Sequence, residues 1–130
     1  MTPELAYLAW SAVLLIAHVV IQATVSDLNI GLGYALGAQD EEREPDSLIA
    51  RRIERSLINF IQTYPAFIAL ACVIAISGAS TETTALGAAV WFWARVVYIP
   101  AYVSGIYMVR SIVWFVALGG LGMMAWPLFF

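Results

Sequence analysis

Polar side chains recur at helical spacing inside three apolar segments of this 130-residue chain. The first segment carries Arg55, Asn59 and Gln62, the second carries Arg95, Tyr98 and Tyr102, and the third begins with Arg110. Because side chains three and four residues apart share one face of a helix, each group forms a single polar stripe. Guanidinium groups form paired, charge-assisted hydrogen bonds with carboxylates. Arginines gathered in this way predict a site for an anionic ligand.

The position of Arg95 carries most of this argument. It lies deep in an apolar run, where a charge costs about 2.5–3.5 kcal/mol or more. Arg95 should therefore face the protein interior and have a partner. The apolar run that contains Arg95 has no acid, and the run that contains Arg55 has only Glu54, at its beginning. An anionic ligand would supply the missing negative charge.

Roles without a ligand account for the same residues. Asn59 and Gln62 could form hydrogen bonds between helices, each worth about 0.6–2 kcal/mol in a membrane. Arg95 could bond to helix carbonyls that are exposed near Pro100. Other arginines could be membrane-edge charges that set the topology and bind lipid headgroups, namely Arg51, Arg52, Arg55 and Arg110.

The composition indicates that these stripes lie in a membrane. Hydrophobic residues make up 62% of the chain, charged residues make up 12%, and the mean hydropathy is +0.86. The net charge of −3 leaves no basic excess for binding nucleic acid. Each apolar run approaches the roughly 20 residues that span a bilayer as a helix. The backbone must satisfy its own hydrogen bonds in lipid, which favours helices, and no run alternates like a strand of a membrane barrel.

We therefore predict an all-α integral membrane protein that forms one four-helix bundle over residues 1–130. The helices are expected at about 4–26, 47–77, 82–103 and 108–129. The links at 77–83 and 104–109 are short, which makes neighbouring helices antiparallel. Residues 26–47 are expected to form one long, acidic and solvated loop.

The distribution of arginines predicts the orientation. Arg43, Arg51, Arg52 and Arg55 lie in or beside the first loop, and Arg110 lies beside the third. The second loop and both termini have no base. The positive-inside rule then places loops one and three in the cytoplasm and both termini outside. All three polar stripes would consequently lie in the cytoplasmic half of the bilayer.

Three further features are expected to be structural. His18 should be a packed or lipid-edge residue, because no second metal-type residue accompanies it. Cys72 is the one cysteine, which excludes a disulfide within one chain, and its apolar setting disfavours it as a nucleophile. The glycines of the segment 119–122, GGLG, indicate close helix contact, since no phosphate-loop context surrounds them.

The segments ERSLINFIQTYP and ARVVYIPAYVSGIYMVRS resemble the MAPEG family, the membrane-associated proteins in eicosanoid and glutathione metabolism, and most closely its bacterial branch. The family pattern E-R-x-x-x-N-x-x-E-x-x-P is matched by Glu54, Arg55, Asn59 and Pro65, with Gln62 in place of the second acid. The resemblance covers essentially the whole chain. Its other matches are Arg95, Tyr98 and Tyr102 in the helix expected at 82–103, and Arg110 at the beginning of the helix expected at 108–129.

This resemblance implies a homotrimer in a bacterial inner membrane, with glutathione held between subunits in the cytoplasmic half. By the resemblance, Arg55, Asn59 and Gln62 would hold polar groups of the peptide. Its carboxylate end would be held, and the cleft lined, by Arg95, Tyr98 and Tyr102. Arg110 would lie near the sulfur and favour the thiolate, since a thiol with a pKa near 8.5 is a poor nucleophile until a cation lowers that pKa.

The sequence leaves two functions open. One is a glutathione-dependent transferase or peroxidase that acts on apolar electrophiles or lipid peroxides dissolved in the membrane. The other is a non-catalytic membrane protein that binds lipid or a protein partner in the same cleft. Gln62 brings no charge where the family has an acid, and Asp27 stands where glutathione-using relatives often carry bases. A lone four-helix unit is expected to leave Arg95 and Arg110 poorly enclosed, which also favours a trimer.

Overall fold

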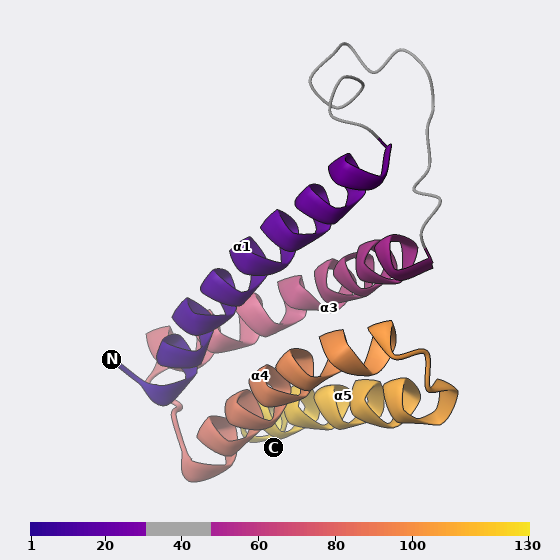
Figure 1. The fold of residues 1–130 in the computed structure, drawn as a ribbon. Coiled ribbons are helices and arrows are strands. Elements are labelled where there is room, and N and C mark those ends of the chain that lie inside the picture. Colours follow the sequence, from indigo (N-terminus) through magenta and orange to yellow (C-terminus); the bar gives the residue numbers. More distant parts are fainter. Residues whose placement is uncertain (31–47) are drawn as a thin grey trace.

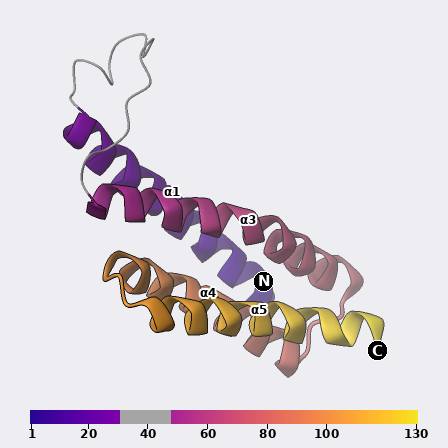
Figure 2. The same cartoon turned by 90° about the vertical axis from the view of Figure 1, so that its right-hand side faces the viewer.

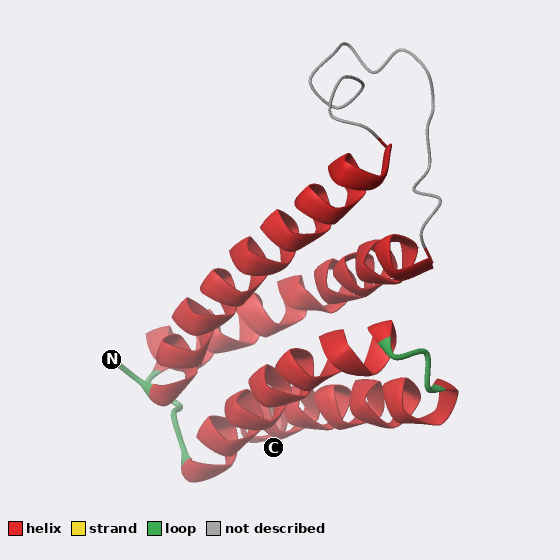
Figure 3. Ribbon diagram, viewed as in Figure 1, coloured by secondary structure: helices red, strands yellow, loops and turns green. Residues whose placement is uncertain are grey.

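The computed structural model of the chain describes residues 1–30 and 48–130. Four helices make up this part: α1 (Pro3–Ile30), α3 (Leu48–Ser77), α4 (Glu82–Val103) and α5 (Tyr107–Phe129). Short turns join α3 to α4 and α4 to α5, and no strand occurs within the described ranges (Figures 1 and 3). The predicted all-α class with four apolar helices is confirmed.

All four helices are long and apolar enough to cross a membrane. The 22 residues of α4 rise about 33 Å, enough for a hydrocarbon core of about 30 Å. Large apolar side chains, such as Ile16, Trp93 and Phe115, are exposed on the outer surface, where lipid would cover them. The chain is therefore a multi-pass integral membrane protein.

The first helix continues further than the sequence analysis expected. It ends at Ile30, about one turn beyond residue 26. The segment Ser26–Ile30 contains no glycine or proline to stop a helix, and Gly31 follows it in the sequence. The rest of the expected acidic loop, including Arg43, lies outside the described residues.

The helices are arranged as two antiparallel pairs, α1 with α3 and α4 with α5. Both chain termini and the α3–α4 turn lie at one end of the molecule, and the α4–α5 turn lies at the other (Figures 1 and 2). The beginning of α3 lies at the same end as the α4–α5 turn. This arrangement brings the first half of α3 beside the last turns of α4 and the first turns of α5.

Aromatic rings form the centre of the bundle. The Trp91 ring of α4 stacks on Phe67 of α3 at a centroid distance of 3.9 Å, and Tyr64 and Phe60 pack against the same indole. The Tyr64 and Ser11 hydroxyls, 2.8 Å apart, are hydrogen-bonded and link α3 to α1. These contacts hold the three helices together near the centre of the bundle.

A buried carboxylate joins the beginnings of α1 and α4. The Ser80 hydroxyl donates to both oxygens of Glu4, at 3.1 and 2.9 Å, and the Thr84 hydroxyl also donates to Glu4. Thr84 forms a reciprocal capping box with Thr81, which satisfies backbone N–H groups at the beginning of α4. One acid therefore fixes α1 against α4 at the end that carries the termini.

Close backbone contact joins α4 to α5 at two glycines. A Cβ placed on Gly120 would lie 2.7 Å from the Gly87 carbonyl oxygen and 2.8 Å from the Trp91 nitrogen. The prediction of helix contact at GGLG is thus confirmed for Gly120, whereas a Cβ on Gly119 or Gly122 would have no neighbour within 4 Å.

Gly120→Ala is expected to destabilise the protein, because the added methyl group would meet backbone atoms that no rotamer change can move. Overpacking of this kind costs about 1–3 kcal/mol. Gly119→Ala is the matched control, since its methyl group would enter open space and alanine favours a helix by about 1 kcal/mol over glycine. Thermal unfolding in detergent should show a lower midpoint for the first variant and an equal or higher one for the second. Equal midpoints for both variants would contradict the close contact.

Candidate functional site

A pocket of about 380 Å³ lies where α3, α4 and α5 converge near the α4–α5 turn. Its size falls within the range of about 300–1,000 Å³ that is typical of ligand sites. We call it the donor pocket, and it is lined by Asn59, Tyr98, Tyr102, Arg110, Ser111, Trp114 and Phe115. Four of the seven site residues expected from the sequence are therefore brought together.

The short α4–α5 turn positions most of this lining. Tyr98 and Tyr102 stand one turn apart near the end of α4, and their ring centroids are 5.6 Å apart. α4 ends at Val103, and Arg110 follows within the first turn of α5. Its guanidinium lies 5.3 Å from the Tyr102 ring centroid, which is a cation–π distance. Two adjacent helix ends thus present two phenols and one cation to the same space.

Arg95 lies behind the wall of the donor pocket. Its side chain is 1% exposed, and its Nη1 donates to the Asn59 Oδ1 across 2.9 Å. Its Cζ is 4.4 Å from the Tyr98 ring centroid and 5.1 Å from that of Phe60. Arg95 therefore holds two residues of the pocket wall, Asn59 and Tyr98.

The hydrogen bond from Arg95 also fixes which way the Asn59 amide points. A guanidinium only donates, so the amide atom facing it must be the oxygen. The Asn59 NH₂ group makes no hydrogen bond within the described part of the chain. Its two donors are consequently available to a ligand in the donor pocket.

The polar lining of the donor pocket consists of groups that can donate hydrogen bonds. It combines an amide NH₂, two phenols, one hydroxyl and one indole N–H with the Arg110 guanidinium, and no carboxylate of the described residues lines it. A ligand that accepts several hydrogen bonds and carries negative charge suits such a lining.

A smaller pocket of about 210 Å³ shares Tyr102 and Arg110 with the donor pocket. We call it the arginine pocket, and it is lined by Leu48, Arg52, Arg55, Tyr102, Gly105 and Arg110. The Nη1 of Arg52 donates to the Val103 carbonyl oxygen at 3.1 Å, which satisfies a carbonyl at the end of α4. Three cations thus meet beside the α4–α5 turn.

The three residues of the polar stripe expected on α3 do not lie in one pocket. Asn59 lines the donor pocket, Arg55 lines the arginine pocket, and Gln62 is exposed and lines neither. Arg55 and Gln62 are seven residues apart, which separates them by about 10 Å along the helix axis, and they share no pocket within one chain.

The family model for MAPEG matches residues 7–130 of the chain. The chain belongs to the MAPEG family. In the same comparisons, neither the curated proteins nor the solved structures include a match. The recognition of the family from ERSLINFIQTYP and ARVVYIPAYVSGIYMVRS is therefore confirmed, and MAPEG membership agrees with the four apolar helices.

Arg95 of this MAPEG chain is enclosed without a second subunit. The expectation that a lone unit would leave this residue poorly enclosed is wrong, because it is 1% exposed within one chain. Asn59 and the aromatic rings of Phe60 and Tyr98 enclose it. The expected interior position and partner of Arg95 are confirmed, and its partner is Asn59 rather than the carbonyls near Pro100.

Several lining residues of this MAPEG pocket were not expected from the sequence. Ser111 follows Arg110 directly, and Trp114 and Phe115 follow one turn later on the same face of α5. Extending the stripe from Arg110 by helical spacing would have found them. The contact between Arg52 and Val103 has no such signal, because it joins residues 51 positions apart.

His18 is buried against the Phe60 ring, at a centroid distance of 6.2 Å. Of the two expected positions, packed or at the lipid edge, the structure shows the packed one. Neither ring nitrogen has a hydrogen-bond partner among the described residues.

Proposed function

We propose that this MAPEG protein is a glutathione-dependent transferase or peroxidase that acts on apolar electrophiles or lipid peroxides dissolved in the membrane. One observation carries the proposal: a pocket in a membrane-spanning bundle whose polar lining consists of hydrogen-bond donors and one cation. Glutathione is an anionic tripeptide, and its carboxylates and peptide carbonyls accept hydrogen bonds. The chemistry of the lining therefore fits it.

The proposed division of labour follows the positions of the residues. The Asn59 amide and the Tyr98 and Tyr102 hydroxyls donate to carbonyl and carboxylate oxygens of glutathione. Arg110 supplies positive charge at the pocket and stabilises an anion beside it. Arg95 supports the site from behind by holding Asn59 and Tyr98.

The cation at Arg110 also accounts for reactivity. Glutathione supplies a thiol, and only its thiolate is an effective nucleophile. The Arg110 guanidinium favours the ionised form by charge attraction, so the nucleophile is present at neutral pH. Trp114 and Phe115 place apolar surface beside that cation, where an apolar acceptor from the membrane would approach.

Assembly and orientation are part of this proposal. Arg55 and Gln62 lie at the exposed surface of α3, outside the donor pocket, and a neighbouring subunit of a homotrimer would bring further partners to them. Light scattering with the detergent mass subtracted measures the trimer. The donor pocket would face the cytoplasm and both termini the outside, so an alkaline phosphatase fused after Phe130 should be active.

The proposal predicts that the purified, detergent-solubilised protein binds glutathione in a calorimeter. Glutathione that extends from the donor pocket into the adjoining arginine pocket would meet Arg55. Arg55→Ala should then weaken this binding about ten- to a hundredfold, because a hydrogen bond to a charged group is worth about 1.5–3 kcal/mol. Arg51→Ala is the control, because Arg51 is an exposed arginine at the same membrane edge that lines neither pocket. Gln62→Glu, which restores the acid of the family pattern, should keep or improve activity.

A second function would apply if glutathione does not bind. The arginine pocket gathers three cations at the membrane edge, an arrangement that also suits an anionic lipid headgroup. In that case the protein binds lipid or a protein partner without catalysis. Absence of both glutathione binding and thiolate absorbance in the wild type would reject the catalytic proposal in favour of this one.

A further inference from the structure

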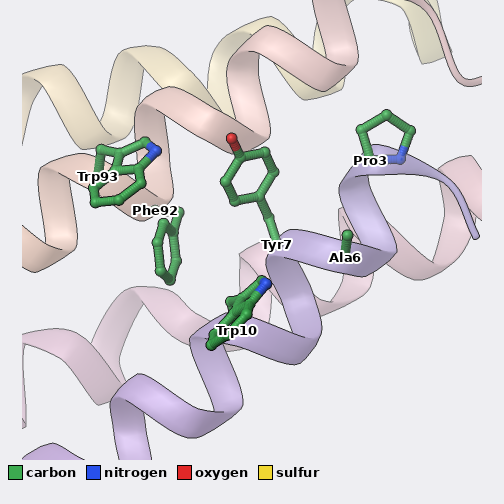
Figure 4. Close-up of a pocket in the computed structure, with 6 residues that line it drawn as sticks. All are labelled: Pro3, Ala6, Tyr7, Trp10, Phe92 and Trp93. Atoms are coloured by element: carbon green, nitrogen blue, oxygen red, sulfur yellow. The ribbon is translucent and has the colours of Figure 1, made fainter.

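A third pocket, of about 550 Å³, lies between α1 and α4 and shares no residue with the donor pocket or the arginine pocket. Four of its six lining residues are aromatic. We call it the aromatic pocket, and it is lined by Pro3, Ala6, Tyr7, Trp10, Phe92 and Trp93 (Figure 4). Its volume lies in the middle of the range of about 300–1,000 Å³ for ligand sites.

The aromatic pocket opens toward lipid. It is formed by the first two turns of α1 and the middle of α4, both within membrane-spanning segments. Trp10 is 63% exposed and Trp93 is 58% exposed, although both are large and apolar. A lipid can therefore enter this pocket directly from the surrounding membrane.

Three hydrogen-bond donors line the aromatic pocket without partners. Within the described part of the chain, neither the Tyr7 hydroxyl nor the indole N–H groups of Trp10 and Trp93 form a hydrogen bond. In Figure 4 the nitrogen atoms of both indoles lie on the ring edges nearest to Tyr7. Donors that face lipid on a membrane-spanning helix have few acceptors around them, so an acceptor from a ligand would relieve an unfavourable state.

The side chains of the aromatic pocket also indicate whether a bound ligand would react. No cation, carboxylate or thiol lines the aromatic pocket, so the lining favours binding without reaction. The Tyr7 and Phe92 ring centroids are 5.5 Å apart and those of Phe92 and Trp93 are 5.2 Å apart, so three of the four aromatic walls pack against one another. A hydrocarbon chain that carries one carbonyl group matches both the apolar walls and the three donors.

We infer that the aromatic pocket binds the acyl chain of a membrane lipid, whose ester or carboxyl oxygen accepts hydrogen bonds from Tyr7 and the two indoles. A second copy of this chain fits less well. Away from the helix ends, the exposed side chains of the described helices are apolar except for Gln62, and the backbone groups are bonded within each helix. A helix from a neighbouring subunit would therefore leave most of the three donors unsatisfied.

Quenching of tryptophan fluorescence by brominated acyl chains tests this inference, because bromine quenches an indole that it touches. The full-length protein is titrated with phosphatidylcholine brominated on its acyl chains, within a background of unbrominated lipid, and separately with brominated stearic acid. The two titrations distinguish a phospholipid from a free fatty acid as the source of the acyl chain. We expect a saturable component of quenching at low fractions of one of these lipids.

Variants assign that component to the pocket. Trp10→Phe and Trp93→Phe should each remove part of it, whereas Trp126→Phe should leave it intact. Trp126 is the matched control, since it is 63% exposed, as Trp10 is, but lies on α5. Tyr7→Phe removes only a hydroxyl and should weaken binding about three- to tenfold. Ala6→Leu should fill the pocket and weaken binding at least tenfold, with Ala12→Leu on the exposed surface of α1 as its control.

Three outcomes of the quenching experiment are distinguishable. Saturable quenching that depends on Trp10, Trp93 and Tyr7 supports the site. Non-saturable quenching, equal for Trp10 and Trp126, would show ordinary surrounding lipid and overturn it. An absence of quenching at Trp10 and Trp93 while Trp126 is quenched would show that another subunit covers the pocket, which also overturns it.

Discussion

Arg110→Ala is expected to lower glutathione conjugation at pH 7 by roughly ten- to thirtyfold while leaving much of the glutathione binding intact. Without the Arg110 cation, the pKa of the bound thiol returns toward about 8.5, and only a few per cent of it is ionised at pH 7. The other donors of the pocket still hold the peptide. The conjugation rate with chlorodinitrobenzene and the ultraviolet absorbance of the thiolate measure the effect.

The pH profile provides the sharper test of Arg110. The variant should gain activity as the pH rises toward and beyond 8.5, because the thiol then ionises without help. The wild type should already have reached its plateau at lower pH, so the ratio of the two rates should shrink with rising pH. Arg51→Ala, at an exposed position outside both pockets, should follow the wild type. A variant rate that stays parallel to the wild-type rate at every pH would assign Arg110 to binding alone.

Arg95→Met is expected to weaken glutathione binding at least tenfold without lowering the thermal stability of the protein. The buried guanidinium makes one hydrogen bond, and its Nε and Nη2 have no partner among the described residues. Replacing a buried charge with an apolar side chain of similar length is often neutral or stabilising by about 1–4 kcal/mol. Binding should nevertheless suffer, because Asn59 loses the donor that orients its amide and Tyr98 loses the cation on its ring.

In Arg95→Met, glutathione binding should fall while thermal stability stays the same or rises, and this combination makes the experiment informative. A residue with only a structural role would lower stability and binding together. Arg95→Lys keeps the buried charge but loses the planar fork of the guanidinium, so it should retain part of the glutathione binding and show none of the stability gain. Unchanged binding in Arg95→Met would remove Arg95 from the site altogether.

The membrane-spanning helices were predictable because their signal is local. Long apolar runs separated by short polar links define α3, α4 and α5 in the sequence as they do in the structure. The end of α1 was less predictable, since Asp27 and Asn29 resemble loop residues but do not stop a helix. The motif residues of α3, α4 and α5 could also be found, because helical spacing marks each stripe before the helices are assembled.

What the sequence could not provide is the pairing between stripes. That Arg95 bonds to Asn59, and not to a backbone carbonyl, depends on how α3 and α4 meet. The separation of Gln62 from the donor pocket depends on the same crossing. The aromatic pocket was equally hidden, because its two exposed indoles, Trp10 and Trp93, come from helices that are distant in the sequence.

The first helix, α1, illustrates how polar contacts determine the rotation of a membrane-spanning helix about its own axis. Its buried polar residues, Glu4, Ser11 and His18, recur every seven positions and so lie nearly on one line along the helix. Lipid solvates every apolar face of α1 equally well, so hydrophobic burial does not distinguish one rotation from another. The bonds of Glu4 to α4 and of Ser11 to α3 do distinguish them. Insertion of α1 into the bilayer and its docking to the other helices can thus be separate steps, the second of which selects the register.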